Sequence, residues 1–128
     1  MIYGIGSDIV AIERMRKLLE KYGDNFARRI LAPDEWAAYE SSQNRANLLA
    51  KRFAAKEAFA KAMGTGLRHP VSLQNISVIH NHLGKPDFHL DPLVADLLEV
   101  QGIQKYHLSL SDEKEMACAF VILEGACL

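Results

Sequence analysis

The chain has little cysteine and no long apolar run. Among its 128 residues only Cys118 and Cys127 carry thiols, so we predict reduced cysteines in a cytoplasmic protein, with Cys118 in the core. No uninterrupted apolar stretch is long enough to span a bilayer, and no secretory leader pattern is visible. His80, His82 and His89 lack the spacing of zinc ligands, so we place them on a hairpin. Because no stretch is long enough to span a bilayer, we expect no membrane partner.

Several nucleotide and hydrolase motifs are also missing. There is no Gly-Lys-Ser/Thr pattern, and the pair Gly4 and Gly6 lacks the third glycine of the dinucleotide fingerprint. The composition allows a Ser-His-Asp triad, but no Gly-x-Ser-x-Gly elbow accompanies it, which argues against an acyl-transfer hydrolase.

The net charge of −1 conceals an uneven distribution. Residues 1–63 carry eleven Lys or Arg against eight acids, and residues 64–128 carry four against eight. The basic excess gathers in the first helix and its exit, where it forms either a solvated face or a dock for an acidic partner. It is too small for nucleic acid and has no aromatic stacking pattern.

The hydropathy pattern predicts an α+β fold, with residues 1–128 forming a single domain large enough for its own core. No linker, repeat or low-complexity stretch interrupts it. The expected helices are 11–22, 33–41, 45–63 and 92–100, and the expected strands are 1–6, 74–80, 87–90, 105–111 and 116–123.

The helix expected over 45–63 is apolar nearly all round, yet it carries charges. Its small residues form one face suited to close packing: Ala54, Ala55, Ala58 and Ala62. Glu57 and Lys61 are neighbours, four residues apart, beside the opposite face. They are either a stabilising surface pair or members of a site, since buried charges are rare unless paired or liganded.

Two glycines and an acidic residue near the start of the chain form a second candidate element of the site. Gly4 and Gly6 allow a tight turn or a close approach, and Asp8 follows at the end of the first strand. Asp8 alone would suit a helix cap. If Asp8 and Glu57 converge, however, the two carboxylates form a site for magnesium, with Lys61 directed at the same phosphates.

The segment Tyr106–Asp112 alternates as a strand does. Tyr106, Leu108 and Leu110 share one face, while His107, Ser109 and Ser111 share the other. The polar face is either solvated or part of a site.

Together these segments resemble the holo-acyl-carrier-protein synthases, the bacterial phosphopantetheinyl transferases of fatty-acid synthesis. The likeness covers nearly the whole chain, in the order of that family. The matching pieces are Gly4–Val10, Ala27–Trp36, Lys51–Gly66, Leu83–Pro86, His107–Asp112 and Ala117–Glu124.

The resemblance implies an antiparallel sheet wrapped around the long helix, assembled as a homotrimer. It also implies that coenzyme A donates phosphopantetheine to a serine of apo-acyl carrier protein, with Mg²⁺ held by Asp8 and Glu57. These two residues and Lys61 are the expected catalytic group. Either Glu57 or a water on the metal would take the serine proton.

The resemblance further implies two sets of contacts. The expected coenzyme A contacts are Arg52, Lys61, Gly64, Thr65, Gly66, His107 and Ser109, some of them across a subunit boundary. Acyl carrier protein would dock on the first helix and its exit, through Arg14, Met15, Leu18, Lys21, Phe26, Arg28 and Arg29.

Two other classes stay open. A nucleotide-binding scaffold would use Arg52 and Lys61 without needing both acids, whereas a magnesium-dependent phosphohydrolase would use the same site with water as acceptor. Two carboxylates facing a pyrophosphate repel it unless a cation intervenes, so Asp8 and Glu57 discriminate against the scaffold.

Overall fold

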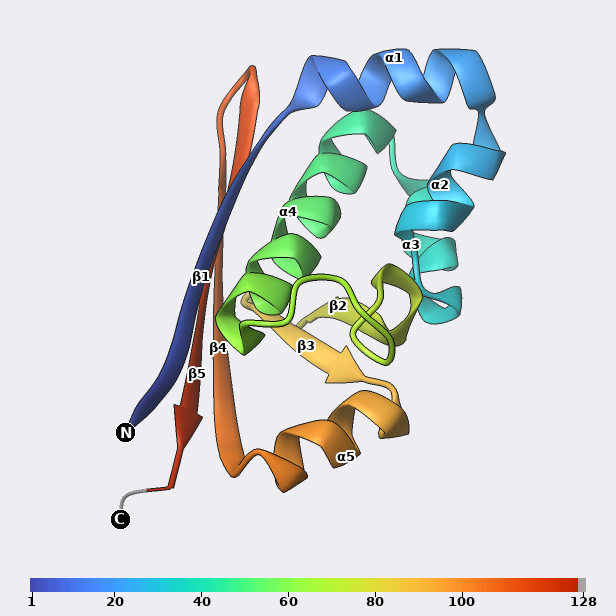
Figure 1. The fold of residues 1–128 in the computed structure, drawn as a ribbon. Helices are drawn as coiled ribbons and strands as arrows, with labels where there is room; N and C mark the ends of the chain where they lie inside the picture. The colour runs from blue at the N-terminus through green and yellow to red at the C-terminus, as the bar shows by residue number, and fades with distance from the viewer. Residues whose placement is uncertain (127–128) are drawn as a thin grey trace.

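The computed structural model describes residues 1–126 (Figure 1), so the prediction for Cys127 lies outside the described residues. Helices and strands confirm the α+β class. In chain order they are β1 (Ile2–Ala11), α1 (Ile12–Tyr22), α2 (Asp24–Ile30), η1 (Pro33–Glu35), α3 (Trp36–Ser41), α4 (Arg45–Met63), η2 (Leu73–Asn75), β2 (Ile76–His80), β3 (Pro86–Leu90), α5 (Pro92–Val100), β4 (Ile103–Asp112) and β5 (Met116–Gly125).

The strands form two antiparallel sheets, of order β1-β5-β4 and β2-β3. The hairpin β2-β3 is therefore a separate sheet, whereas the resemblance implies a single antiparallel sheet. The larger sheet lies along one side of α4, and α1, α2, α3 and the hairpin lie around its other sides (Figure 1). The sheet and the helices thus enclose α4 together, and the sheet wrapped around the long helix that the resemblance implies is not confirmed.

The first strand extends beyond the range 1–6 that the sequence predicts. β1 continues to Ala11, which pairs with Met116 of β5, so Asp8 lies within the strand and not at its end. Alternate residues of β1 share a face, and Gly4, Gly6 and Asp8 all lie on the face toward α4. The seven-residue helix α2 is missed by the hydropathy pattern, and the helix predicted over 33–41 begins as a 3₁₀ turn.

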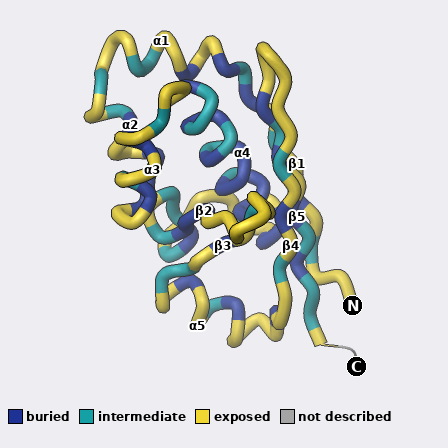
Figure 2. The backbone as a smooth tube through the Cα atoms, turned by 180° about the vertical axis from the view of Figure 1, so that it is seen from behind, coloured by how far each residue is buried: buried dark blue, intermediate teal, exposed yellow. Residues whose placement is uncertain are grey.

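Backbone contact between β1 and α4 confirms the small-residue face of the long helix. A Cβ added at Gly4 would lie 1.9 Å from the carbonyl oxygen of Ala62, and one at Gly6 would lie 1.8 Å from that of Ala58. No side chain fits in this space. The glycines of β1 therefore serve close approach and not a turn, and α4 is buried over most of its length (Figure 2).

A buried ion network holds the other side of α4. The Glu35 carboxylate accepts hydrogen bonds from the backbone N–H groups of Ala32 at 2.8 Å and Val78 at 3.0 Å. It also accepts from the Arg52 guanidinium at 2.9 Å and from the Lys56 ammonium. Because Glu35 is only 2 % exposed, these four donors replace its water.

The face of the larger sheet away from α4 is unusually apolar. Ile5, Ile9 and Phe120 are 55 %, 63 % and 47 % exposed there. Cys118 also faces this side and is half-buried, so the prediction that it lies in the core is wrong. Alternation explains the error: Ala117 and its alternate neighbours in β5 face α4, which turns Cys118 outward.

Within residues 1–126, no helix combines the length and the apolar character needed to cross a membrane.

The packing of β1 on α4 predicts a strong effect of one methyl group. Gly6→Ala must push the strand from the helix backbone, so we expect a loss of about 2–3 kcal/mol in the free energy of unfolding, measured by urea denaturation. Ser7→Ala is the matched control on the outer face of the same strand, and it should change stability by less than about 0.5 kcal/mol. Equal stabilities of the two variants would contradict this packing.

Candidate active site

Asp8 and Glu57, which lie far apart in the chain, approach each other between β1 and α4. Burial raises the pKa of the Glu57 carboxyl above its ordinary value, and the Asp8 carboxylate nearby raises this pKa further. Lys61 and Arg14 act on the same pKa in the opposite direction. Two like charges are therefore held close together in a partly buried place, which favours a shared cation.

Lys61 completes this cluster from the next turn of α4. Its ammonium donates to the backbone oxygen of Ser7 at 3.0 Å and to the Asp8 carboxylate at 3.1 Å. The sequence predicts Lys61 as the neighbour of Glu57, but the structure pairs it with Asp8. About half of the Lys61 side chain is exposed (53 %), so its charge remains accessible to a ligand.

Arg14 of α1 lies beside this cluster, which the sequence does not indicate. Its guanidinium is 5.9 Å from the centre of the Phe53 ring on α4, and its charge lowers the pKa of Glu57. No spacing rule connects α1 to Glu57, because only the packing of α1 across α4 brings them together. The basic surface of α1 thus reaches the carboxylate pair.

The turn after α4 is a left-handed helix end. Gly64 and Gly66 have φ values of +79° and +66°, which favour glycine. The N–H of Gly64 donates to the carbonyl of Lys61, and that of Gly66 donates to the carbonyl of Ala60. Thr65 donates its hydroxyl to the carbonyl of Gly66. Both glycine N–H groups therefore close the helix. The coenzyme A contacts of Gly64, Thr65 and Gly66 stay a prediction.

Arg52, His107 and Ser109 are not brought together within one chain. Arg52 is 7 % exposed and paired with Glu35 on the α4 side of the sheet. His107 and Ser109 are exposed on the opposite face, where His107 lies 3.1 Å from the Glu124 carboxylate. A common coenzyme A contact by these residues therefore requires a second copy of the chain.

A cleft of about 450 Å³ lies on the predicted carrier-protein dock. Leu18 and Phe26 line it, as does Arg29, all three being predicted contacts. Tyr22 of α1 and Asn25 of α2 line it too, and the sequence misses them because it does not show which side chains of these two helices border one cleft.

The other predicted dock residues differ in their exposure. Met15 is only 1 % exposed, so its prediction as a surface contact is wrong: it lies on the face of α1 that enters the core. Lys21 and Arg28 are exposed, with Lys21 over the Tyr22 ring at 5.2 Å and Arg28 over the Trp36 ring at 4.7 Å.

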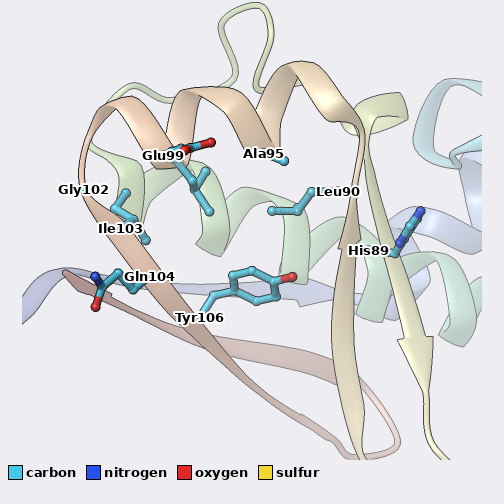
Figure 3. Close-up of a pocket in the computed structure, with 9 residues that line it drawn as sticks. His89, Leu90, Ala95, Glu99, Gly102, Ile103, Gln104 and Tyr106 are labelled. Atoms are coloured by element: carbon cyan, nitrogen blue, oxygen red, sulfur yellow. The ribbon is translucent and has the colours of Figure 1, made fainter. Parts of the chain in front are cut away.

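A different cleft, of about 390 Å³, lies between β3, α5 and β4 (Figure 3). The ring of Tyr106 forms part of its wall, and Glu99 of α5 lies across from it. None of the predicted site residues lines this cleft, so we do not place the chemistry there.

The donor set fits a hard divalent cation. Asp8 and Glu57 supply carboxylate oxygens, and no group of three or more His, Cys, Asp or Glu side chains able to hold a metal occurs in residues 1–126. Magnesium commonly uses one or two carboxylates together with water and substrate phosphate oxygens. A two-acid site open to an exposed lysine matches that preference.

Comparison with known proteins identifies the family. The model of the 4′-phosphopantetheinyl transferase superfamily matches residues 4–121. The chain belongs to this superfamily. A holo-acyl-carrier-protein synthase of Nitrosospira multiformis is 59 % identical over 124 residues, covering 97 % of this chain and 99 % of the relative.

Solved structures of the phosphopantetheinyl transferases agree. The crystal structure of the Neisseria meningitidis holo-acyl-carrier-protein synthase is 52 % identical, with a TM-score of 0.94, and covers 97 % of this chain and 99 % of its own. The Bacillus anthracis synthase, solved in complex with coenzyme A (3′,5′-ADP), is 37 % identical with a TM-score of 0.81; 98 % of this chain and 99 % of that one align. These findings confirm the resemblance and the enzyme class, a coenzyme A-dependent phosphopantetheinyl transferase.

The proximity of the two carboxylates predicts coupled titration. In metal-free protein, Asp8→Asn should lower the pKa of Glu57 relative to the unsubstituted chain, because a neighbouring negative charge is removed. Carbon-detected NMR titration of the glutamate carboxyl groups measures this. Glu13→Gln, an exposed acid paired with Arg16, is the control that should leave the pKa of Glu57 unchanged.

The same shift affects stability with a defined sign. A raised folded-state pKa means that the folded chain keeps a proton that the unfolded chain has lost. The contribution of Glu57 to the free energy of unfolding therefore falls as pH rises from its ordinary pKa to its raised one. In Asp8→Asn this fall should be smaller. An unchanged pKa of Glu57 in Asp8→Asn would show that the two carboxylates do not interact.

Proposed function

We propose that this chain transfers the phosphopantetheine arm of coenzyme A to a serine hydroxyl of apo-acyl carrier protein, with magnesium bound between Asp8 and Glu57. The observation that carries the proposal is the mutual approach of these two carboxylates, beside Lys61, in a member of this superfamily. Phosphoryl transfer depends on positioning and on neutralising charge, which two acids, a cation and a lysine provide.

Each residue has a distinct task in this proposal. Asp8 and Glu57 hold the metal by one carboxylate each. Magnesium held there would neutralise charge on the non-bridging oxygens of the pyrophosphate. Lys61, anchored by Ser7 and Asp8, directs a point charge at the same oxygens.

The reaction exchanges one phosphorus–oxygen bond for another. The serine oxygen forms a bond to the phosphorus that bears the pantetheine arm, and the bond from that phosphorus to the oxygen bridging the pyrophosphate breaks. Adenosine bisphosphate leaves with the bridging oxygen. The serine proton would pass to Glu57 or to a water that the metal holds.

The carrier protein would dock on the basic surface of α1 and α2. The cleft beside Leu18 and Phe26 suits an apolar side chain, and Arg29 on its rim suits an acidic one. Arg14 joins this surface to the carboxylate pair, so a docked serine would lie close to the site.

The assembly we propose is a homotrimer formed through the outer face of the larger sheet. Exposed Ile5, Ile9 and Phe120 give this face the apolar character of a subunit interface. A second copy would also supply His107 or Ser109 to a coenzyme A molecule held near Arg52. Sedimentation equilibrium that finds only monomer would contradict this assembly.

The organisation of residues 1–128 as one transferase domain belongs to the same proposal, and the family match over 4–121 supports it. A role in fatty-acid synthesis and a cytoplasmic location rest on kinship with the bacterial holo-acyl-carrier-protein synthases. Recovery of the native protein outside the cytoplasmic fraction would contradict the location.

Transfer should require both carboxylates. Asp8→Ala and Glu57→Ala should each reduce kcat by on the order of a thousandfold, because the charge stabilisation at stake is several kcal/mol. Mass spectrometry of the carrier protein after incubation with coenzyme A and magnesium measures the gain of the arm, and circular dichroism checks the fold. Glu13→Gln again serves as the control and should retain full activity.

The same assay separates the three classes of function. A transferase modifies the carrier protein and releases adenosine bisphosphate only when that protein is present. A phosphohydrolase releases it from coenzyme A without carrier protein, and a scaffold releases none. Removal of magnesium with a chelator should stop transfer, so full transfer in excess chelator would refute the metal site.

Charge reversal tests the dock. Arg29→Glu should raise KM for the carrier protein about tenfold at low salt, weaken its salt dependence, and leave KM for coenzyme A unchanged, because rim charges chiefly control association. Arg16→Glu is a matched control, since Arg16 is an exposed α1 residue paired with Glu13 and does not line the cleft. Equal KM values for the two variants would place the dock elsewhere.

A further inference from the structure

Lys56 is the most completely buried charge among the described residues, and the proposed chemistry does not use it. Its side chain has no exposed surface. The ammonium donates to the carbonyl of Ile30 at 2.7 Å, to the carbonyl of Leu73 at 2.9 Å, and to the Glu35 carboxylate. An ammonium has three protons, so every donor is satisfied.

The three acceptors belong to three different segments. Ile30 ends α2 in the proposed dock, Leu73 begins η2 after the loop that follows Gly64 and Gly66, and Glu35 ends η1. One cation on α4 therefore connects the helix to the dock, to the segment that follows its own C-terminal turn, and to the short helix before α3.

The neighbour of Lys56 in the chain is Glu57, one of the two proposed metal ligands. On the β1 side, α4 packs against the bare backbone of Gly4 and Gly6. The ion pair of Lys61 with Asp8 also lies there, but the lysine is about half exposed, so the pair holds the rotation of the helix less firmly than a buried network does. Side chains reach about 5–6 Å from a helix axis, so a rotation of about 10° moves a carboxylate by roughly 1 Å. A displacement of that size can cost on the order of a hundredfold in rate.

We propose that Lys56 is a positioning residue: its three bonds fix the rotation of α4 so that Glu57 faces Asp8 at the distance of a shared cation. Arg52, one turn earlier on α4, donates to the other carboxylate oxygen of Glu35. Burial lowers the pKa of Lys56 to about 8, although the nearby Glu35 carboxylate acts to raise this pKa. The ammonium is therefore kept for its contacts, despite the free-energy cost of removing it from water. This inference rests on the proposed function for its kinetic readout.

The experiment compares Lys56→Met with Leu98→Ala, a buried position on α5 outside the network. Both variants should lose stability, Lys56→Met because Glu35 is left with less compensation, so both are assayed well below their unfolding midpoints. Lys56→Met should lower kcat by on the order of a hundredfold, with both KM values within about threefold of the unsubstituted chain. Leu98→Ala should keep kcat within about twofold.

A second measurement is independent of turnover. Calorimetric titration of Mg²⁺ in the presence of coenzyme A should show weaker cation binding in Lys56→Met and unchanged binding in Leu98→Ala. Retention of both kcat and cation affinity by Lys56→Met would overturn the inference and leave Lys56 as a purely structural cation.

A double variant covers the case in which Lys56→Met does not fold. Glu35→Gln combined with Lys56→Met removes both charges and retains one oxygen, which can accept from Ala32 or from Val78, since these two N–H groups donate to different oxygens of Glu35. We expect it to fold with the same low kcat and weakened cation binding, and normal values of both would overturn the inference. If the unsubstituted chain performs no transfer, the proposed function fails, while the titration still decides the role of Lys56.

Discussion

The close contact between the glycines of β1 and the backbone of α4 is the constraint on which the rest of the structure depends. Side chains at Gly4 or Gly6 would overlap the carbonyl oxygens of Ala62 and Ala58, so strand and helix approach as only bare backbone can. Asp8 follows Gly6 on the same face of the strand, and Glu57 precedes Ala58 on the helix. The contact therefore determines that the two carboxylates meet.

A helix held this closely on one side still needs fixing on the other. The network of Glu35, Arg52 and Lys56 does so with charged hydrogen bonds, which are directional where apolar packing is not. Such networks seldom add net stability, because desolvation offsets their attraction. Their value here lies in geometry, since they join α4 to η1, α2 and η2 at defined distances.

The basic surface of α1 and α2 and the carboxylate pair are two neighbouring regions of opposite charge. Basic side chains and an apolar cleft occupy α1 and α2, while the carboxylate pair lies between β1 and α4. Arg14 belongs to the first region and lowers the pKa of Glu57 in the second. In the proposed function, an acidic partner on α1 would therefore lie beside the carboxylate pair that binds the cation.

The sequence by itself determined the features that depend on local pattern: the α+β class, the long helix with its alanine face, the alternation of β4, and the family. It missed α2, which is too short to show periodicity, and it ended β1 early because Gly4 and Gly6 indicate a turn in isolation. Tertiary structure alone decided that Lys61 pairs with Asp8, that Met15 and Lys56 are buried, that Cys118 faces outward, and that Arg14 lies near Glu57. The reason is physical: each of these depends on which distant segment covers a residue, and periodicity records only the residue's own helix or strand.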